Sequence, residues 1–167
     1  SGIVVELDID KDFKKYEHLG PLKGLQFQKD LEKLAFTAGG RTQMAPAQRL
    51  VDFVDGKLSA SLNDCSYQPG LNSAPLHSLL PKIIGGRLRK GFDAFGKKMH
   101  GYYTNEANIV GVESRTSSPV NIPRKESLEH TQIEGLFPCG EGGGYAGGIV
   151  SAAMDGERCA EAAITKM

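Results

Sequence analysis

Hydrophobic residues spaced three or four positions apart predict two amphipathic helices in the first hundred residues. Residues 25–36 carry apolar positions with the period of an α-helix, and the glycines of "TAGG" mark the end of that helix. Residues 84–99 place five apolar side chains on one face, with lysines and arginines mostly elsewhere. The apolar positions are Phe27, Leu31, Leu34 and Ala38 in the first helix and Ile84, Leu88, Phe92, Phe95 and Met99 in the second.

Shorter elements are predicted around these helices. Residues 2–9 are rich in β-branched types and partly alternate between apolar and polar, which is typical of a strand. The stretch "APAQRLVDFVDG", 45–56, predicts a short helix with Pro46 in its first turn and Gly56 at its end. The polar and turn-rich residues 57–72 predict an exposed connection.

The pattern changes after the second amphipathic helix. Short strands are predicted over 109–115, 119–122 and 135–140, followed by a closing helix over 148–166. A boundary near Asn105 therefore separates a mainly helical portion, 1–107, from a β-rich portion, 108–167. The expected class is α/β or α+β.

Composition and charge exclude several functions. Lysine plus arginine and aspartate plus glutamate both number twenty, so no global field attracts nucleic acid or a membrane surface. No apolar run approaches the roughly twenty residues that span a bilayer. The three cysteines are widely spaced, and the four histidines have no metal-site spacing, which indicates reduced thiols, no metal site and a cytoplasmic protein.

The glycine-rich stretch "GLFPCGEGGGYAGGIVSAAMDG", 135–156, is the strongest candidate for chemistry. Seven glycines lie from Gly135 to Gly148, where a predicted strand turns into a predicted helix. A helix start offers unpaired N–H groups and the positive end of a dipole, which suit an anion or an electron-rich edge of a ligand. Glycine also lets a ligand approach the backbone closely. The sequence therefore predicts a ligand-binding turn.

Glu141, within this turn, narrows the kind of ligand. Gly142–Gly147 matches the spacing GxGxxG, but no second strand follows the helix, so the sequence does not favour pyrophosphate binding there. A carboxylate accepts hydrogen bonds from sugar hydroxyls and would repel a phosphate. Glu141 therefore fits a polyol or ribityl chain, with a simple role as a helix-start acid as the alternative.

With "GVESRTSSPVNI" upstream, this stretch resembles the C-terminal flavin motif of two-dinucleotide-fold FAD-dependent oxidoreductases. The chain is similar in particular to the C-terminal part of FAD-dependent dehydrogenases related to the BaiN-type flavoproteins, strongly over 108–165 and more loosely over 1–107. The resemblance implies that Gly140 and Glu141 bind the ribityl or its adjoining phosphate-bearing chain of FAD. It also implies that Gly147, Gly148 and Ile149 direct backbone N–H groups at the pyrimidine edge of the flavin.

The resemblance places a second polar turn near the flavin or the substrate. Arg115 would supply a cation, and Thr116 and Ser117 would supply hydroxyl donors. An ordinary turn held by its own hydroxyl groups is an equal alternative.

The resemblance also implies a larger protein. The N-terminal GxGxxG unit that holds the ADP half of FAD is missing here, so the chain is expected to be a C-terminal fragment that binds FAD weakly or not at all alone. The expected function is transfer of a hydride or electrons between the flavin and an unknown small molecule, with NAD(P)H as a candidate partner. The alternative is a non-catalytic ligand-binding or interaction domain that keeps a flavoprotein-like glycine turn.

Overall fold

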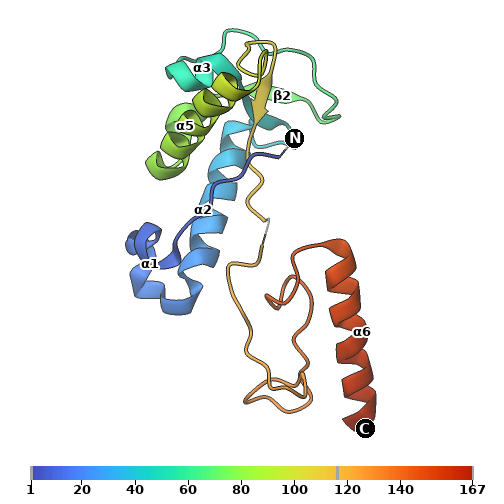
Figure 1. The fold of residues 1–167 in the computed structure, drawn as a ribbon. Coiled ribbons are helices and arrows are strands. Elements are labelled where there is room, and N and C mark those ends of the chain that lie inside the picture. The colour runs from blue at the N-terminus through green and yellow to red at the C-terminus, as the bar shows by residue number, and fades with distance from the viewer. Residues whose placement is uncertain (1, 116, 167) are drawn as a thin grey trace. The chain divides into compact units, whose positions relative to one another are not determined.

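The structure is a computed structural model that describes residues 2–115 and 117–166. The chain divides into two compact units (Figure 1). Unit 1 contains Ser1–Lys14 and Lys29–Ser114, and unit 2 contains Lys15–Gln28 and Arg115–Met167. Each unit is described by itself.

A small sheet and four helices form most of unit 1. The central strand β1 (Ala45–Arg49) pairs in parallel with β2 (Leu71–Ser73) and antiparallel with β3 (Asn108–Val110). The helices are α1 (Ile9–Asp12), α3 (Leu50–Asp55), α4 (Leu76–Leu79) and α5 (Lys82–Lys98). This mixture of helix and strand confirms the predicted α/β class.

The core of unit 1 lies where α3, α4 and α5 meet. Leu50, Phe53, Leu76 and Phe92 are all buried there. The rings of Phe53 and Phe92 pack edge to face, with centroids 5.9 Å apart. Phe92 belongs to the predicted apolar face of its helix, so that face is turned toward the core.

Unit 2 contains two long helical segments. The 3₁₀ segment η1 (Lys14–Leu22) leads into α2 (Lys23–Ala38), which begins in unit 2 and continues in unit 1. The closing helix α6 (Ile149–Lys166) is drawn in red in Figure 1. The three long predicted helices, α2, α5 and α6, are confirmed.

Two predictions for the first sixty residues are wrong. Residues 2–8 form no strand, because no neighbouring strand pairs with them among the described residues, and Asp8 instead caps α1. The predicted helix 45–56 divides into β1 and α3, and Pro46 lies in the strand. Only the predicted end is confirmed, since Gly56 has the left-handed φ of 72°.

The predicted strands beyond Asn108 are largely wrong. Within the described part of 109–115, the strand β3 reaches only to Val110, and neither 119–122 nor 135–140 forms a strand. Their backbone groups bond to turns instead: Ile122 N–H donates to the carbonyl of Gly143 at 3.1 Å. The glycine-rich stretch therefore follows an irregular segment rather than a strand.

Candidate functional site

The glycine-rich turn of unit 2 is closed by its own backbone. The N–H of Tyr145 donates to the carbonyl of Gly140, and that of Gly144 donates to the carbonyl of Glu141, both at 3.0 Å. Asn121 adds a side-chain bond from Nδ2 to the carbonyl of Gly144 at 3.2 Å. These bonds give the turn a defined conformation just before α6 begins.

Two of its glycines are required by the fold. Gly144 has a φ of +82°, and a Cβ placed there would lie 2.7 Å from the carbonyl oxygen of Val120. A Cβ at Gly143 would lie 3.0 Å from the carbonyl oxygen of Cys139. Internal packing explains both residues without a ligand.

Three other glycines have no such internal reason. A Cβ at Gly142 or Gly147 would meet nothing within 4 Å, and one at Gly148 would meet only the Ser151 hydroxyl at 3.8 Å. None of the three has a positive φ. Their open backbone fits a molecule that approaches from outside this chain.

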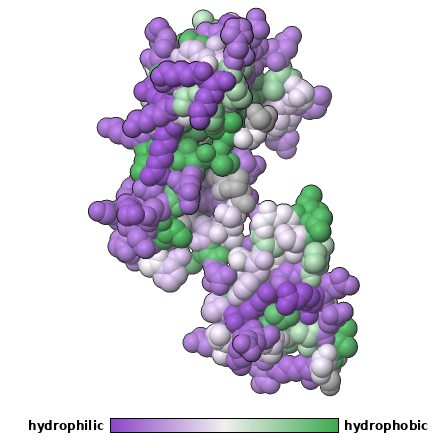
Figure 2. Space-filling model, in the orientation of Figure 1, coloured by the Kyte–Doolittle hydropathy of each residue, from purple (hydrophilic) through white to green (hydrophobic). Residues whose placement is uncertain are grey.

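The start of α6 is exposed and apolar. Ile149 is 92% exposed and Val150 is 72% exposed, and hydrophobic side chains gather along this helix in Figure 2. The first N–H groups of a helix have no partner within it. Glu141 is also exposed, so its carboxylate is accessible beside this helix start.

A buried ion pair lies behind the turn. Arg124 donates to both carboxylate oxygens of Asp155, at 2.7 and 3.0 Å, and both side chains are about nine-tenths buried. Their charges shift each other's titration. The bond from Arg124 lowers the pKa of Asp155 below its usual range, and the bond to Asp155 raises the pKa of Arg124.

Arg124 has further partners around the turn. Its guanidinium carbon lies 3.6 Å from the centre of the Tyr145 ring, and Nη1 also bonds to the carbonyl of Pro138 and to the thiol of Cys159. Cys159 is a free cysteine, and its burial raises the pKa of the thiol.

Asp155 connects the ion pair to the turn itself. Its Oδ2 accepts the N–H of Gly140 at 2.9 Å, directly before Glu141. Neither Arg124 nor Asp155 was predicted from the sequence. The only local signal is that Asp155 and Cys159 lie four positions apart in a helix, so they share a buried face.

The predicted site residues fall into two groups. The first group lies together at the turn and the start of α6 because its members are close in sequence. It consists of Gly140, Glu141, Gly147, Gly148 and Ile149. Close contacts and hydrogen bonds of the turn extend to Val120, Asn121 and Ile122. Arg115 and Ser117 are exposed, and their role stays a prediction, while Thr116 lies outside the described residues.

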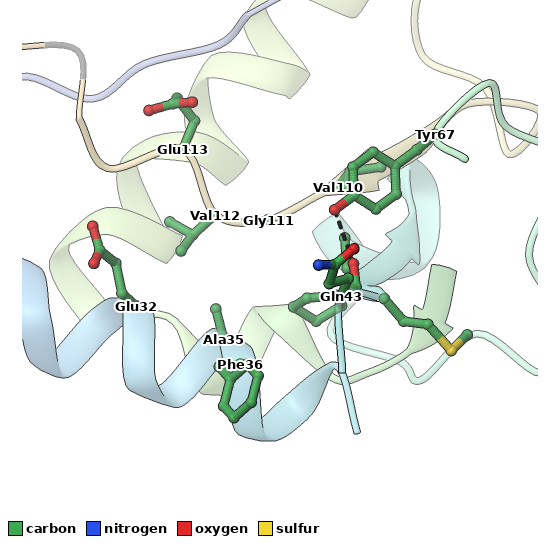
Figure 3. A pocket seen from close by; sticks show the side chains of 12 residues that line it. Glu32, Ala35, Phe36, Gln43, Tyr67, Val110, Gly111, Val112 and Glu113 are labelled. Carbon is green, nitrogen blue, oxygen red and sulfur yellow. Dashed lines mark hydrogen bonds between the residues drawn. The ribbon is translucent and has the colours of Figure 1, made fainter. Parts of the chain in front are cut away.

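Unit 1 contains a separate open cavity of about 460 Å³ (Figure 3). The side chains of Glu32 and Glu113 lie at one end, and Tyr67 lies at the other, where its hydroxyl donates to the carbonyl of Gln43 at 2.9 Å. Apolar lining comes from residues such as Phe36 and Val110. The volume is within the range of small-molecule sites.

The described part of the chain shows neither a metal site nor a membrane-spanning helix. No group of three histidine, cysteine, aspartate or glutamate side chains within 2–115 and 117–166 is arranged to hold a metal ion. Among the same residues, no helix has the length and apolar character needed to cross a membrane.

Comparison with known proteins identifies the family. The family described as "FAD-dependent protein, C-terminal domain-like" matches residues 1–116. The chain belongs to this FAD-dependent family. The match lies mostly on the part where the sequence resemblance is looser, and most of the matched residues belong to unit 1.

One relative aligns with nearly all of this chain. An uncharacterized protein of Clostridium beijerinckii (strain ATCC 51743 / NCIMB 8052) is 41% identical over 168 residues. The alignment includes 99% of this chain and 31% of that protein. The chain thus spans about a third of the length of this relative.

The residues of the glycine turn fit the cofactor that the family description names. Open glycine backbone, an exposed carboxylate and the N–H groups of a helix start are donors and acceptors suited to a polyhydroxyl chain and an electron-rich ring. That Gly140, Glu141, Gly147, Gly148 and Ile149 hold part of FAD stays a prediction.

Proposed function

We propose that this chain is part of an FAD-dependent oxidoreductase, a dehydrogenase related to the BaiN-type flavoproteins. Residues 108–167 would complete a Rossmann-like FAD-binding domain, and 1–107 would form a substrate or cap portion. The observation that carries the proposal is the set of open glycines at Gly142, Gly147 and Gly148, which no contact among the described residues explains. Membership of an FAD-dependent family supports it.

The turn would act by binding and orienting the cofactor. FAD, when bound, supplies the acceptance and donation of a hydride or electrons. Glu141 would accept hydrogen bonds from ribityl hydroxyls through its exposed carboxylate. The N–H groups of Gly148 and Ile149, at the positive end of α6, would stabilise negative charge on the flavin edge.

Unit 1 offers a candidate place for the substrate. The cavity lined by Glu32 and Tyr67 has room for a small organic molecule. Arg115, with Thr116 and Ser117, would offer a cation and hydroxyl donors to the flavin or to an anionic substrate. NAD(P)H is the proposed partner for electron exchange.

The first test is the full-length protein expressed from its own gene. We expect a protein much larger than this chain, with the visible absorption of bound flavin. A colourless product would favour the second candidate, a ligand-binding or interaction domain in which Glu141 is only a helix-start acid. The exposed apolar start of α6 is compatible with that candidate, since a protein partner would also cover it.

A substitution at Gly147 tests the turn directly. We expect Gly147→Val in the full-length protein to reduce flavin occupancy at least tenfold, because the new side chain occupies the space beside the helix-start N–H groups. Gly156→Val is the matched control, since a Cβ there also meets nothing within 4 Å. Equal flavin content in both variants, together with unchanged content in Glu141→Ala, would exclude the proposed binding mode.

A further inference from the structure

We propose that Arg124 and Asp155 are positioning residues for the flavin, which hold the glycine turn in its binding conformation and keep the region of the α6 start electrically neutral. This inference rests on the proposed function. It concerns two residues that neither the sequence motif nor the family match identifies.

The position of Arg124 suits such a role. It bonds to the carbonyl of Pro138, before the turn, and lies against the ring of Tyr145, within the turn. It also forms two bonds with Asp155 in α6. One guanidinium therefore ties the entry, the middle and the following helix of the same short segment.

Asp155 carries this constraint to the backbone. Its Oδ2 is shared between Nη1 of Arg124, at 3.0 Å, and the N–H of Gly140, at 2.9 Å. Gly140 has a φ of +66°, a conformation that most residues avoid. The carboxylate thereby fixes the peptide between Cys139 and Gly140, one residue before Glu141.

Such a constraint matters because the turn is rich in glycine. Glycine loses more conformational freedom on ordering than any other residue. If the turn were flexible before binding, the ligand would have to order it, and this cost would lower the affinity for the ligand. A turn that is already ordered avoids this loss. The ring of Tyr145 contributes, since its hydroxyl donates to the carbonyl of Ile122 at 2.8 Å.

The electrostatic part of the inference comes from the place of Asp155 in the helix. Asp155 lies in the second turn of α6, roughly 9 Å along the axis from Ile149 at 1.5 Å per residue. An unpaired carboxylate there would oppose negative charge at the helix start, where a reduced flavin would place it. Arg124 cancels that charge, and both side chains are shielded from water.

Opposite charge changes should therefore move the flavin potential in opposite directions. In the full-length flavoprotein, Arg124→Met leaves Asp155 unpaired, so we expect a more negative reduction potential. Asp155→Asn leaves Arg124 unpaired, so we expect a more positive potential. Both variants should bind flavin about 10- to 100-fold more weakly, by analogy with the loss found at metal sites when a side chain that orients a metal ligand is removed.

The measurement is flavin content and reduction potential, by equilibration with a reference dye, for the wild type and each variant. Glu129→Gln is the matched control, because it removes a carboxylate paired with Lys166 at the other end of α6. We expect the control to match the wild type. Potentials that stay unchanged, or that move in the same direction in both variants, would overturn the proposal.

A double variant keeps the test decisive if the single variants fail to fold. Arg124→Met with Asp155→Leu replaces the buried pair by apolar side chains, an exchange that proteins often tolerate. We expect weakened flavin binding with a potential near that of the wild type, and wild-type affinity would refute the positioning role. A wild-type protein that takes up no flavin would refute the proposed function itself, and this inference with it.

Discussion

Unit 1 and unit 2 bury different kinds of side chain. Among the described residues, the buried hydrophobic side chains of unit 1 include those of Leu31, Leu50, Phe53, Leu76 and Phe92, whereas unit 2 contributes Cys159. Unit 2 instead buries the polar side chains of Lys23, His130 and Asp155. Unit 1 is thus organised around an apolar core, and unit 2 around hydrogen bonds and an ion pair.

The difference indicates what each unit requires. Apolar burial is favourable wherever it occurs, so a core such as that of unit 1 stabilises its own fold. A buried ion pair contributes little net stability, because desolvation of the charges offsets their attraction. We therefore expect unit 1 to be the more stable of the two, and unit 2 to depend on what covers its exposed helix start.

Removing the centre of the unit 1 core should have the largest effect. Phe53 is fully buried, and we expect Phe53→Ala to lower the free energy of unfolding by about 3–5 kcal/mol, from lost burial and a new cavity. Phe36→Ala is the control, since Phe36 is 53% exposed. Urea denaturation of both variants measures the difference, and equal losses would contradict an apolar core at this position.

Glycine substitutions should sharpen the comparison within unit 2. Gly144→Ala should cost about 1–3 kcal/mol, because alanine disfavours the positive φ and its Cβ would crowd the Val120 carbonyl. Gly147→Ala should leave stability nearly unchanged, since its Cβ meets nothing. Thermal unfolding of the chain compares the two. A costly Gly147→Ala would show that this glycine, too, serves the fold.

A pH effect in unit 1 should be smaller. The imidazole Nδ1 of His77 accepts a hydrogen bond from the buried amide of Gln48 at 2.8 Å, which requires the neutral ring. Burial lowers the pKa of His77 below its usual 6.5. As the pH falls, His77 of the unfolded chain therefore binds a proton before His77 of the folded chain does. The free energy of unfolding decreases from about pH 6.5, the usual pKa, down to the lowered pKa of the folded state.

Unfolding free energies measured at pH 7.5 and pH 5.5 test this expectation. The wild type should be less stable at the lower pH. In His77→Gln, the change in unfolding free energy between the two pH values should be smaller, because the part due to His77 is removed. A His77→Gln variant with the same pH dependence as the wild type would assign the effect to other groups.

Local patterns were enough to predict much of the fold. The helical period predicted α2, α5 and α6, because each has a face or composition visible within a few turns. The glycines and Glu141 pointed to the turn before α6 for the same reason. The strands were predicted poorly, since β1 and β3 depend on partners about sixty residues apart, and a strand without a partner, as in 2–8, does not form.

The amino-acid sequence by itself determined the long helices, the glycine turn and the resemblance to FAD-dependent proteins, because these depend on neighbouring residues. Only the tertiary structure separated Gly144, which the fold needs, from Gly147, which it does not. It also joined Arg124 to Asp155 across 31 positions. A bidentate ion pair has no local spacing to reveal it, since its geometry exists only once the intervening chain has folded back on itself.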